Sequence, residues 1–73
     1  MPHIPLNALR TFEAVASRLS FAKGAEALNV SPAAVSSQIR ALEQRLNQPL
    51  FYRQGRQVTL TEAGAKLLPG VQR

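Results

Sequence analysis

The spacing of apolar residues predicts helices over most of this chain. A first helix is expected over residues 6–18, where apolar positions repeat every three or four residues and fall on one face. These positions, with the residue just beyond the helix, are Leu9, Phe12, Val15, Ala16 and Leu19. A shorter helix is expected over residues 21–28, with Ser20 as its N-cap and Asn29 as the left-handed residue that ends it.

The third predicted helix spans residues 32–46 and has two different faces. Ser31 can cap its free amides, and Pro32 suits the first helical position, where a backbone N–H is not needed. At about 100° per residue, the apolar side chains gather in a narrow arc. That arc holds Val35, Ile39, Leu42 and Leu46. The opposite side holds Ala33, Ser36, Ser37, Arg40, Gln44 and Asn47.

This second face is short-chained at its start, polar throughout, and carries a single arginine. Small side chains let a helix approach another surface closely, while hydroxyls, amides and arginine hydrogen-bond to base edges and phosphates. We therefore interpret the helix as one that lies in the major groove of DNA. The alternative is an ordinary amphipathic surface helix, and this stretch alone does not distinguish the two.

Charge and the preceding helix favour DNA. Nine Lys and Arg against four acidic residues give a net charge of +5 in 73 residues, which favours a polyanionic partner. Residues 28–31 have the length of the tight turn that joins two crossed helices in a helix-turn-helix. A hairpin of helices with no nucleic-acid role uses the same turn, but the basic charge favours the DNA-binding interpretation.

Two short strands are expected at residues 50–53 and 58–60, where aromatic and β-branched residues concentrate. Residues 54–57 form the turn between them, and a glycine there supplies the positive φ that such loops need. A basic hairpin after a helix-turn-helix is a wing. Arg53 and Arg56 would project from it toward phosphates or the narrow minor groove. The alternative is that both arginines are solvated surface charges.

A last helix is expected to begin after Thr61, which caps it. We expect the Pro69-Gly70 pair to interrupt this helix. The fold class is therefore mostly α: a winged helix-turn-helix with a three-helix core, a two-stranded wing and a truncated linker helix. We expect a flexible leader, a winged helix-turn-helix domain whose helix-turn-helix covers about residues 21–40, and the start of a linker helix for dimerisation. Their expected bounds are 1–5, 6–60 and 61–73.

Other function classes have less support. The chain has no cysteine and one histidine, His3. It also lacks an Asp for a triad and a Gly-rich phosphate loop, so we expect no enzyme activity, cofactor or metal. No apolar run is long enough to span a membrane and there is no signal-peptide core, so we expect no membrane partner and a cytoplasmic location. The main alternative is a winged-helix module that binds a protein without specific DNA readout. It would need an apolar patch where Ser36, Ser37 and Arg40 stand.

Seven short motifs give the chain a family resemblance. They are LNALRTF (6–12), LSF (19–21), AEALNVS (25–31), AVSSQI (34–39), LE (42–43), PLF (49–51) and LTEAG (60–64). In this order and spacing, the chain resembles the N-terminal DNA-binding domain of LysR-type transcriptional regulators. Its details are most similar to the branch of the glycine-cleavage and β-lactamase activators.

The resemblance implies a parent protein that pairs into a homodimer or tetramer through a long linker helix. It also implies a further domain, absent from this chain, that senses a small-molecule effector. The base-contacting positions of the family fall on Pro32, Ala33, Ser36 and Ser37, with Gln38 and Arg40 close to the DNA backbone. The minor-groove arginine falls on Arg56, and we add Ser31, at the start of this surface, to the expected DNA-binding residues.

Two positions depart from the pattern of the family. Many members have glutamine where Pro32 stands and arginine where Ser37 stands. With fewer bidentate contacts to bases, specificity would shift toward the wing and toward DNA shape.

Overall fold

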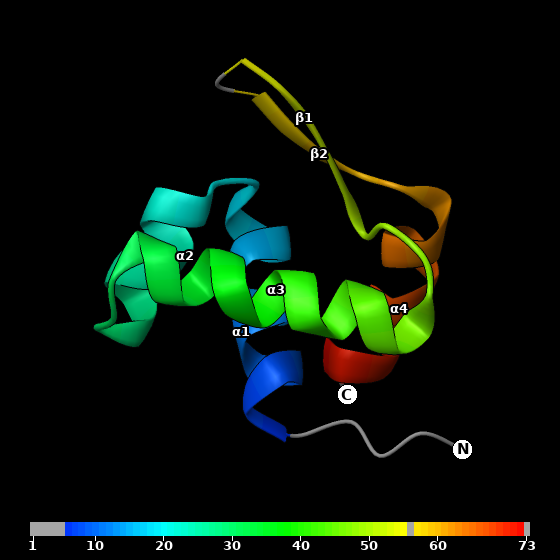
Figure 1. The fold of residues 1–73 in the computed structure, drawn as a ribbon, viewed down its shortest axis with the longest axis horizontal. Helices are drawn as coiled ribbons and strands as arrows, with labels where there is room; N and C mark the ends of the chain where they lie inside the picture. The colour runs from blue at the N-terminus through cyan, green and yellow to red at the C-terminus, as the bar shows by residue number, and fades with distance from the viewer. Residues whose placement is uncertain (1–5, 56, 73) are drawn as a thin grey trace.

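The computed structural model describes residues 6–55 and 57–72, and it is mostly helical. The expected leader, including His3, and the wing residue Arg56 lie outside the described residues. The elements follow in the order α1 (Leu6–Arg18), α2 (Phe21–Leu28), α3 (Pro32–Leu46), β1 (Phe51–Gln54), β2 (Gln57–Leu60) and α4 (Glu62–Gln72). Figure 1 shows α3 crossing in front of α1, with the hairpin of β1 and β2 projecting beyond one side of it.

Capping residues mark the beginnings and ends of α2 and α3 where the sequence predicts. Ser20 Oγ accepts the backbone N–H of Lys23 at 3.1 Å, and Ser31 Oγ accepts that of Ala34 at 3.1 Å. Asn29 and Asn47 close α2 and α3 in the left-handed conformation, with φ of 59° and 55°. Asparagine adopts positive φ more easily than most residues other than glycine. The tight turn of the helix-turn-helix is thereby confirmed.

The core lies where α1, α2 and α3 meet the base of the hairpin. Its largest fully buried side chains are Phe12, Ile39, Leu42, Leu50, Val15 and Val35. The expected apolar face of α3 is therefore confirmed, with Leu46 half-buried at its end. A Cβ on Gly24 would lie 2.8 Å from Val15 Cγ2, so this glycine allows α1 and α2 to cross closely.

The hairpin has a shorter turn than the sequence predicts. Its antiparallel register pairs Phe51 with Leu60 and Gln54 with Gln57, so the strands extend one residue further on each side of the turn. Gly55 has a φ of 59°, and positive φ is what two-residue hairpin turns need. We call residues 51–60 the wing.

Two expectations are wrong in detail. Leu19, grouped above with the apolar face of the first helix, does not pack in the core: it has a φ of 49° and is 47% exposed, because it turns the chain out of α1 toward α2. Pro69 does not interrupt α4, which continues to Gln72. Proline removes one hydrogen bond, to the carbonyl of Ala65. Both residues are exposed, so water can bond that carbonyl.

Candidate nucleic-acid interface

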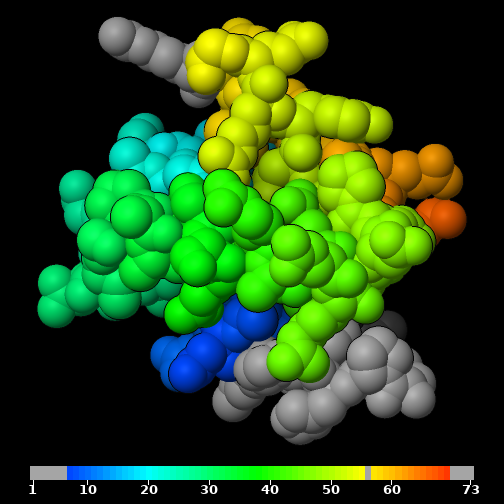
Figure 2. Space-filling view, viewed as in Figure 1, coloured from blue at the N-terminus to red at the C-terminus, as the bar shows by residue number. Residues whose placement is uncertain are grey.

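The outward face of α3 is a continuous exposed surface. The expected site residues of this helix and its cap are exposed except Ser36, which is half-buried: Ser31, Pro32, Ala33, Ser36, Ser37, Gln38 and Arg40. Figure 2 shows α3 filling the middle of one face of the molecule, with the wing beside it. Because the buried side of the same helix packs into the core, the fold itself determines which side chains of α3 face solvent.

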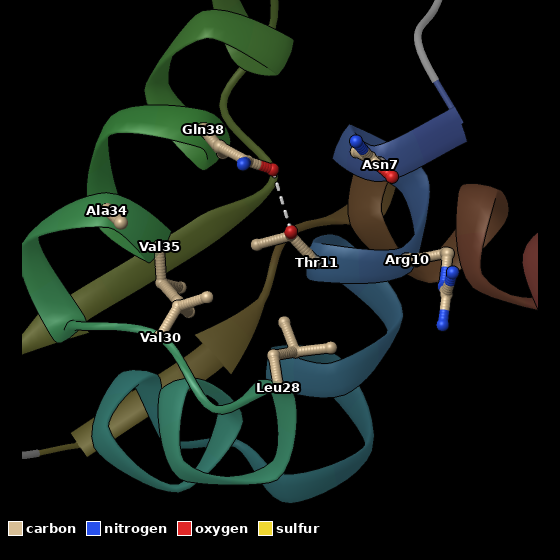
Figure 3. Close-up of a pocket in the computed structure, with 8 residues that line it drawn as sticks. All are labelled: Asn7, Arg10, Thr11, Leu28, Val30, Ala34, Val35 and Gln38. Carbon is tan, nitrogen blue, oxygen red and sulfur yellow. Dashed lines mark hydrogen bonds between the residues drawn. The ribbon is translucent and has the colours of Figure 1, made fainter.

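Gln38 lies at the edge of this surface, toward α1. Its Oε1 accepts a hydrogen bond from Thr11 Oγ1 at 2.7 Å, as Figure 3 shows. Thr11 is 5% exposed, so the bond joins a buried hydroxyl of α1 to an exposed amide of α3. One end of Gln38 is thus held, and its amide nitrogen remains a donor. Thr11 lies on the buried side of α1, but its partner cannot be told from spacing.

A shallow hollow lies beside the first half of α3, between α1 and the turn of the helix-turn-helix. It has a volume of about 270 Å³. Figure 3 shows its polar side at Thr11 and Gln38 and its apolar side at Leu28, Val30 and Val35. Among the described residues, no carboxylate, histidine or cysteine lines it. Across residues 6–55 and 57–72, no three His, Cys, Asp or Glu side chains gather to hold a metal ion.

The wing contacts the start of α2. The guanidinium carbon of Arg53 lies 3.8 Å from the centroid of the Phe21 ring, a cation–π contact. The same ring meets Phe51 edge-on at 5.5 Å between centroids. Arg53 was expected to project from the wing, and it instead lies against α2. Because the ring provides no oxygen, the N–H groups of Arg53 keep their capacity to bind oxygen acceptors.

Two side chains that the sequence did not single out as site residues hold the base of the wing. Glu43 Oε2 accepts the backbone N–H of Leu50 at 2.7 Å and that of Phe51 at 3.4 Å. Thr61 Oγ1 donates to the carbonyl of Pro49 at 2.7 Å and accepts the N–H of Gly64 at 3.0 Å. Thr61 therefore caps α4, as expected, and also ties it to the segment before β1.

Exposed cations lie on the wing and on each of the first three helices. Arg40 on α3 and Arg53 on the wing are exposed, as are Arg18 and Lys23 near the ends of α1 and α2. The arrangement offers hydroxyls, amides and guanidinium groups, which suit hydrogen bonding to bases and phosphates. No helix in the described ranges is long and apolar enough to cross a bilayer.

Comparison with known proteins agrees with this geometry. Residues 6–65 match the family described as bacterial regulatory helix-turn-helix protein, lysR family. The chain is 58% identical over 67 residues to the HTH-type transcriptional activator AmpR of Yersinia enterocolitica. It is 55% identical over 60 residues to the glycine cleavage system transcriptional activator of Escherichia coli strain K12. These alignments cover 92% and 82% of this chain but 23% and 20% of those relatives, so the chain spans about a quarter of their length or less.

Solved structures show the same fold. The chain is similar to the CbnR DBD–DNA complex, with a TM-score of 0.91 and 34% identity over 96% of this chain and 80% of that one. It is also similar to the BenM DBD in complex with benA site 1 DNA, with a TM-score of 0.89 and 33% identity. That match covers 94% of this chain and 78% of the other.

Proposed function

The chain belongs to the LysR family of bacterial regulatory helix-turn-helix proteins, and on that premise we propose how this DNA-binding domain meets its operator. It places α3 in the major groove and the wing at the adjacent minor groove. The observation that carries the proposal is the exposed polar face of α3, whose opposite face is buried in the core. A major groove about 12 Å wide admits one helix.

The side chains of α3 divide by position. Ser36 and Ser37, with hydroxyls, suit hydrogen bonds to base edges, while Ala33 suits contact with a thymine methyl group. Pro32 adds apolar contact at the start of the helix. Ser31 begins the DNA-binding surface at the N-terminal end of α3, where the helix dipole favours a DNA phosphate.

Other side chains bind the DNA backbone. Gln38, held at its oxygen by Thr11, presents its amide nitrogen to a phosphate. Arg40 on α3 and Arg53 on the wing add charge-assisted hydrogen bonds to phosphates. Arg56, which follows Gly55 in the sequence, is assigned to the minor groove, where a narrow A·T-rich stretch attracts arginine.

Assembly and regulation belong to the parent protein. We propose that the parent pairs into a homodimer or tetramer through a helix that continues α4, and that a separate domain binds its small-molecule effector. It then acts on chromosomal DNA in the cytoplasm. The 73 residues alone are expected to be monomeric or weakly dimeric, because stable coiled coils need an apolar seam over three or four heptads. Sedimentation as a tight dimer would contradict this.

Selection from a random pool of duplex DNA tests the function. The expected result is an enriched sequence that the chain binds more tightly than a scrambled duplex in fluorescence anisotropy. If about four phosphates are neutralised, log K against log salt has a slope of about −3.6. Absence of an enriched sequence together with a flat salt response would contradict the proposal and favour a protein partner.

A further inference from the structure

One carboxylate on α3 holds the root of the wing. Glu43 is half-buried, and its Oε2 accepts the N–H groups of Leu50 and Phe51, at 2.7 and 3.4 Å. Leu50 immediately precedes β1, and Phe51 is its first residue. The helix proposed to enter the major groove and the hairpin proposed to meet the minor groove are therefore joined by a directional contact.

The N–H groups of Leu50 and Phe51 bond to Glu43 rather than to the partner strand of the hairpin. Leu50 uses its carbonyl to accept the N–H of Thr61 at 3.1 Å, while its own N–H points to the carboxylate. Among the described strands, β1 pairs only with β2. Leu50 is fully buried, and a buried N–H without an acceptor is strongly unfavourable. Glu43 supplies that acceptor.

Glu43 also shares a side of α3 with residues of the DNA-facing surface. At 100° per residue, it lies about 20° from Ser36 and about 60° from Arg40 around the helix axis. A rotation of α3 that moved Ser36 in the groove would therefore move the root of the wing with it. One side of one helix sets both parts of the interface.

We propose that Glu43 is a positioning residue that sets the angle of the wing relative to α3. Its effect on DNA rests on the function proposed above, but its effect on the wing does not. Apolar packing of Phe51 against Phe12, with 5.5 Å between ring centroids, also holds the wing. Such packing is non-directional, whereas two N–H bonds to one oxygen fix direction. The acceptor oxygen of Glu43, rather than its charge, does this.

Two variants separate the acceptor from the charge. Glu43→Gln keeps an oxygen at the same reach and removes the charge. Glu43→Asp keeps the charge and withdraws the oxygen by one methylene. Residual dipolar couplings of backbone N–H groups in the free 73-residue chain report the orientation of the wing relative to α1, α2 and α3.

The expected result is that the wing couplings of Glu43→Gln equal those of the unsubstituted chain. In Glu43→Asp the wing couplings change while those of the helices do not, and the Leu50 amide exchanges about tenfold faster, as expected when one hydrogen bond is lost. Unchanged wing couplings in Glu43→Asp would overturn the proposal. So would a Glu43→Gln variant that behaves like Glu43→Asp, or a Glu43→Asp variant that melts as early as a core variant such as Ile39→Ala.

A DNA measurement extends the test. On duplexes from the selection that differ only in flanks, A·T against G·C, Glu43→Asp loses the preference for A·T flanks and Glu43→Gln keeps it. A chain that binds no DNA would overturn the proposed function and leave the couplings to decide the role of Glu43. Retention of the A·T preference in Glu43→Asp would overturn the positioning role.

Discussion

The two parts of the proposed interface are held in the domain by different kinds of interaction. α3 is anchored along its length by the buried side chains of Val35, Ile39 and Leu42. The wing contributes Phe51 to the core, with Val58 and Leu60 half-buried against it. It is also held by the carboxylate of Glu43 and the contact of Arg53 with Phe21. The position of α3 is thus inseparable from folding, whereas the wing has less apolar packing and its direction depends on a few polar contacts.

This difference predicts two classes of variant. Changes to the buried side of α3 should unfold the whole domain, because small domains unfold cooperatively. Changes to the outward side of α3 or to the wing contacts should alter DNA binding and leave the helices folded. The single tyrosine, Tyr52, lies 59% exposed on the wing, so its fluorescence reports the wing separately from the helical circular dichroism.

The largest effect is expected at Ile39. Ile39→Ala should lower the free energy of unfolding by about 2–4 kcal/mol through lost burial and a cavity. The urea midpoint of unfolding should fall by the same amount whether it is followed by circular dichroism or by Tyr52 fluorescence. Ala41→Gly, on the exposed side of the same helix, is the control, with an expected loss of about 1 kcal/mol. If Ile39→Ala lowered the free energy of unfolding by no more than the control does, the buried side of α3 would not anchor the domain as described.

A smaller loss is expected at the junction of the wing and α4. Thr61→Val keeps the shape but removes both hydrogen bonds of the buried hydroxyl, so stability should fall by about 1–3 kcal/mol in thermal unfolding. Thr59→Val, the same change on the exposed side of β2, should be nearly neutral. Equal melting temperatures for the two variants would mean that the Thr61 hydroxyl does not hold the junction.

Substitutions on the outward side of α3 should change DNA binding without changing the stability of the domain. Ser36→Ala should keep the melting temperature and weaken binding to the selected duplex by about fivefold, for one lost hydrogen bond of about 1 kcal/mol. Ser17→Ala removes an exposed hydroxyl from α1; it is the control and should leave binding unchanged. The proposed division of α3 fails if Ser36→Ala destabilises the domain as much as Ile39→Ala.

The smallest effect concerns Arg53. Arg53→Gln should reduce the salt slope of binding by about 0.9, the contribution of one phosphate contact. Lys66→Gln removes one charge from α4, where Lys66 pairs with Glu62 at 3.4 Å, and should leave the slope unchanged. If Arg53→Gln has no effect on the slope, Arg53 does not contact a phosphate.

Much of this fold follows from local sequence signals. Ser20, Ser31 and Asn29 mark helix ends by chemistry that acts within a few residues, and the structure confirms all three. The two faces of α3 follow from spacing alone. Leu19 and Pro69 were misjudged for one reason: spacing shows neither the conformation that turns a chain nor the hydration that lets a helix continue through proline.

The contacts that hold the wing could not be predicted. Arg53 and Phe21 lie on different elements, and nothing in the spacing of either indicates that they meet. Glu43 is the one acidic residue of α3, and an acidic side chain on a helix is ordinarily solvated. Its partners are backbone amides, which leave no mark in the sequence. Local chemistry therefore predicted α3 as an interface, and three-dimensional packing was needed to show how the wing is placed beside it.

Replacing purines in the selected duplex by their 7-deaza analogues tests the central claim most directly. This change removes the N7 acceptor, which only the major groove exposes, and leaves the minor groove and the phosphates intact. Entry of α3 into the major groove predicts at least one purine position where the substitution weakens binding by about tenfold, or about 1.4 kcal/mol. The same substitutions in the flanks beside the wing should have no effect. Unchanged affinity at every purine of the selected site would contradict recognition through α3.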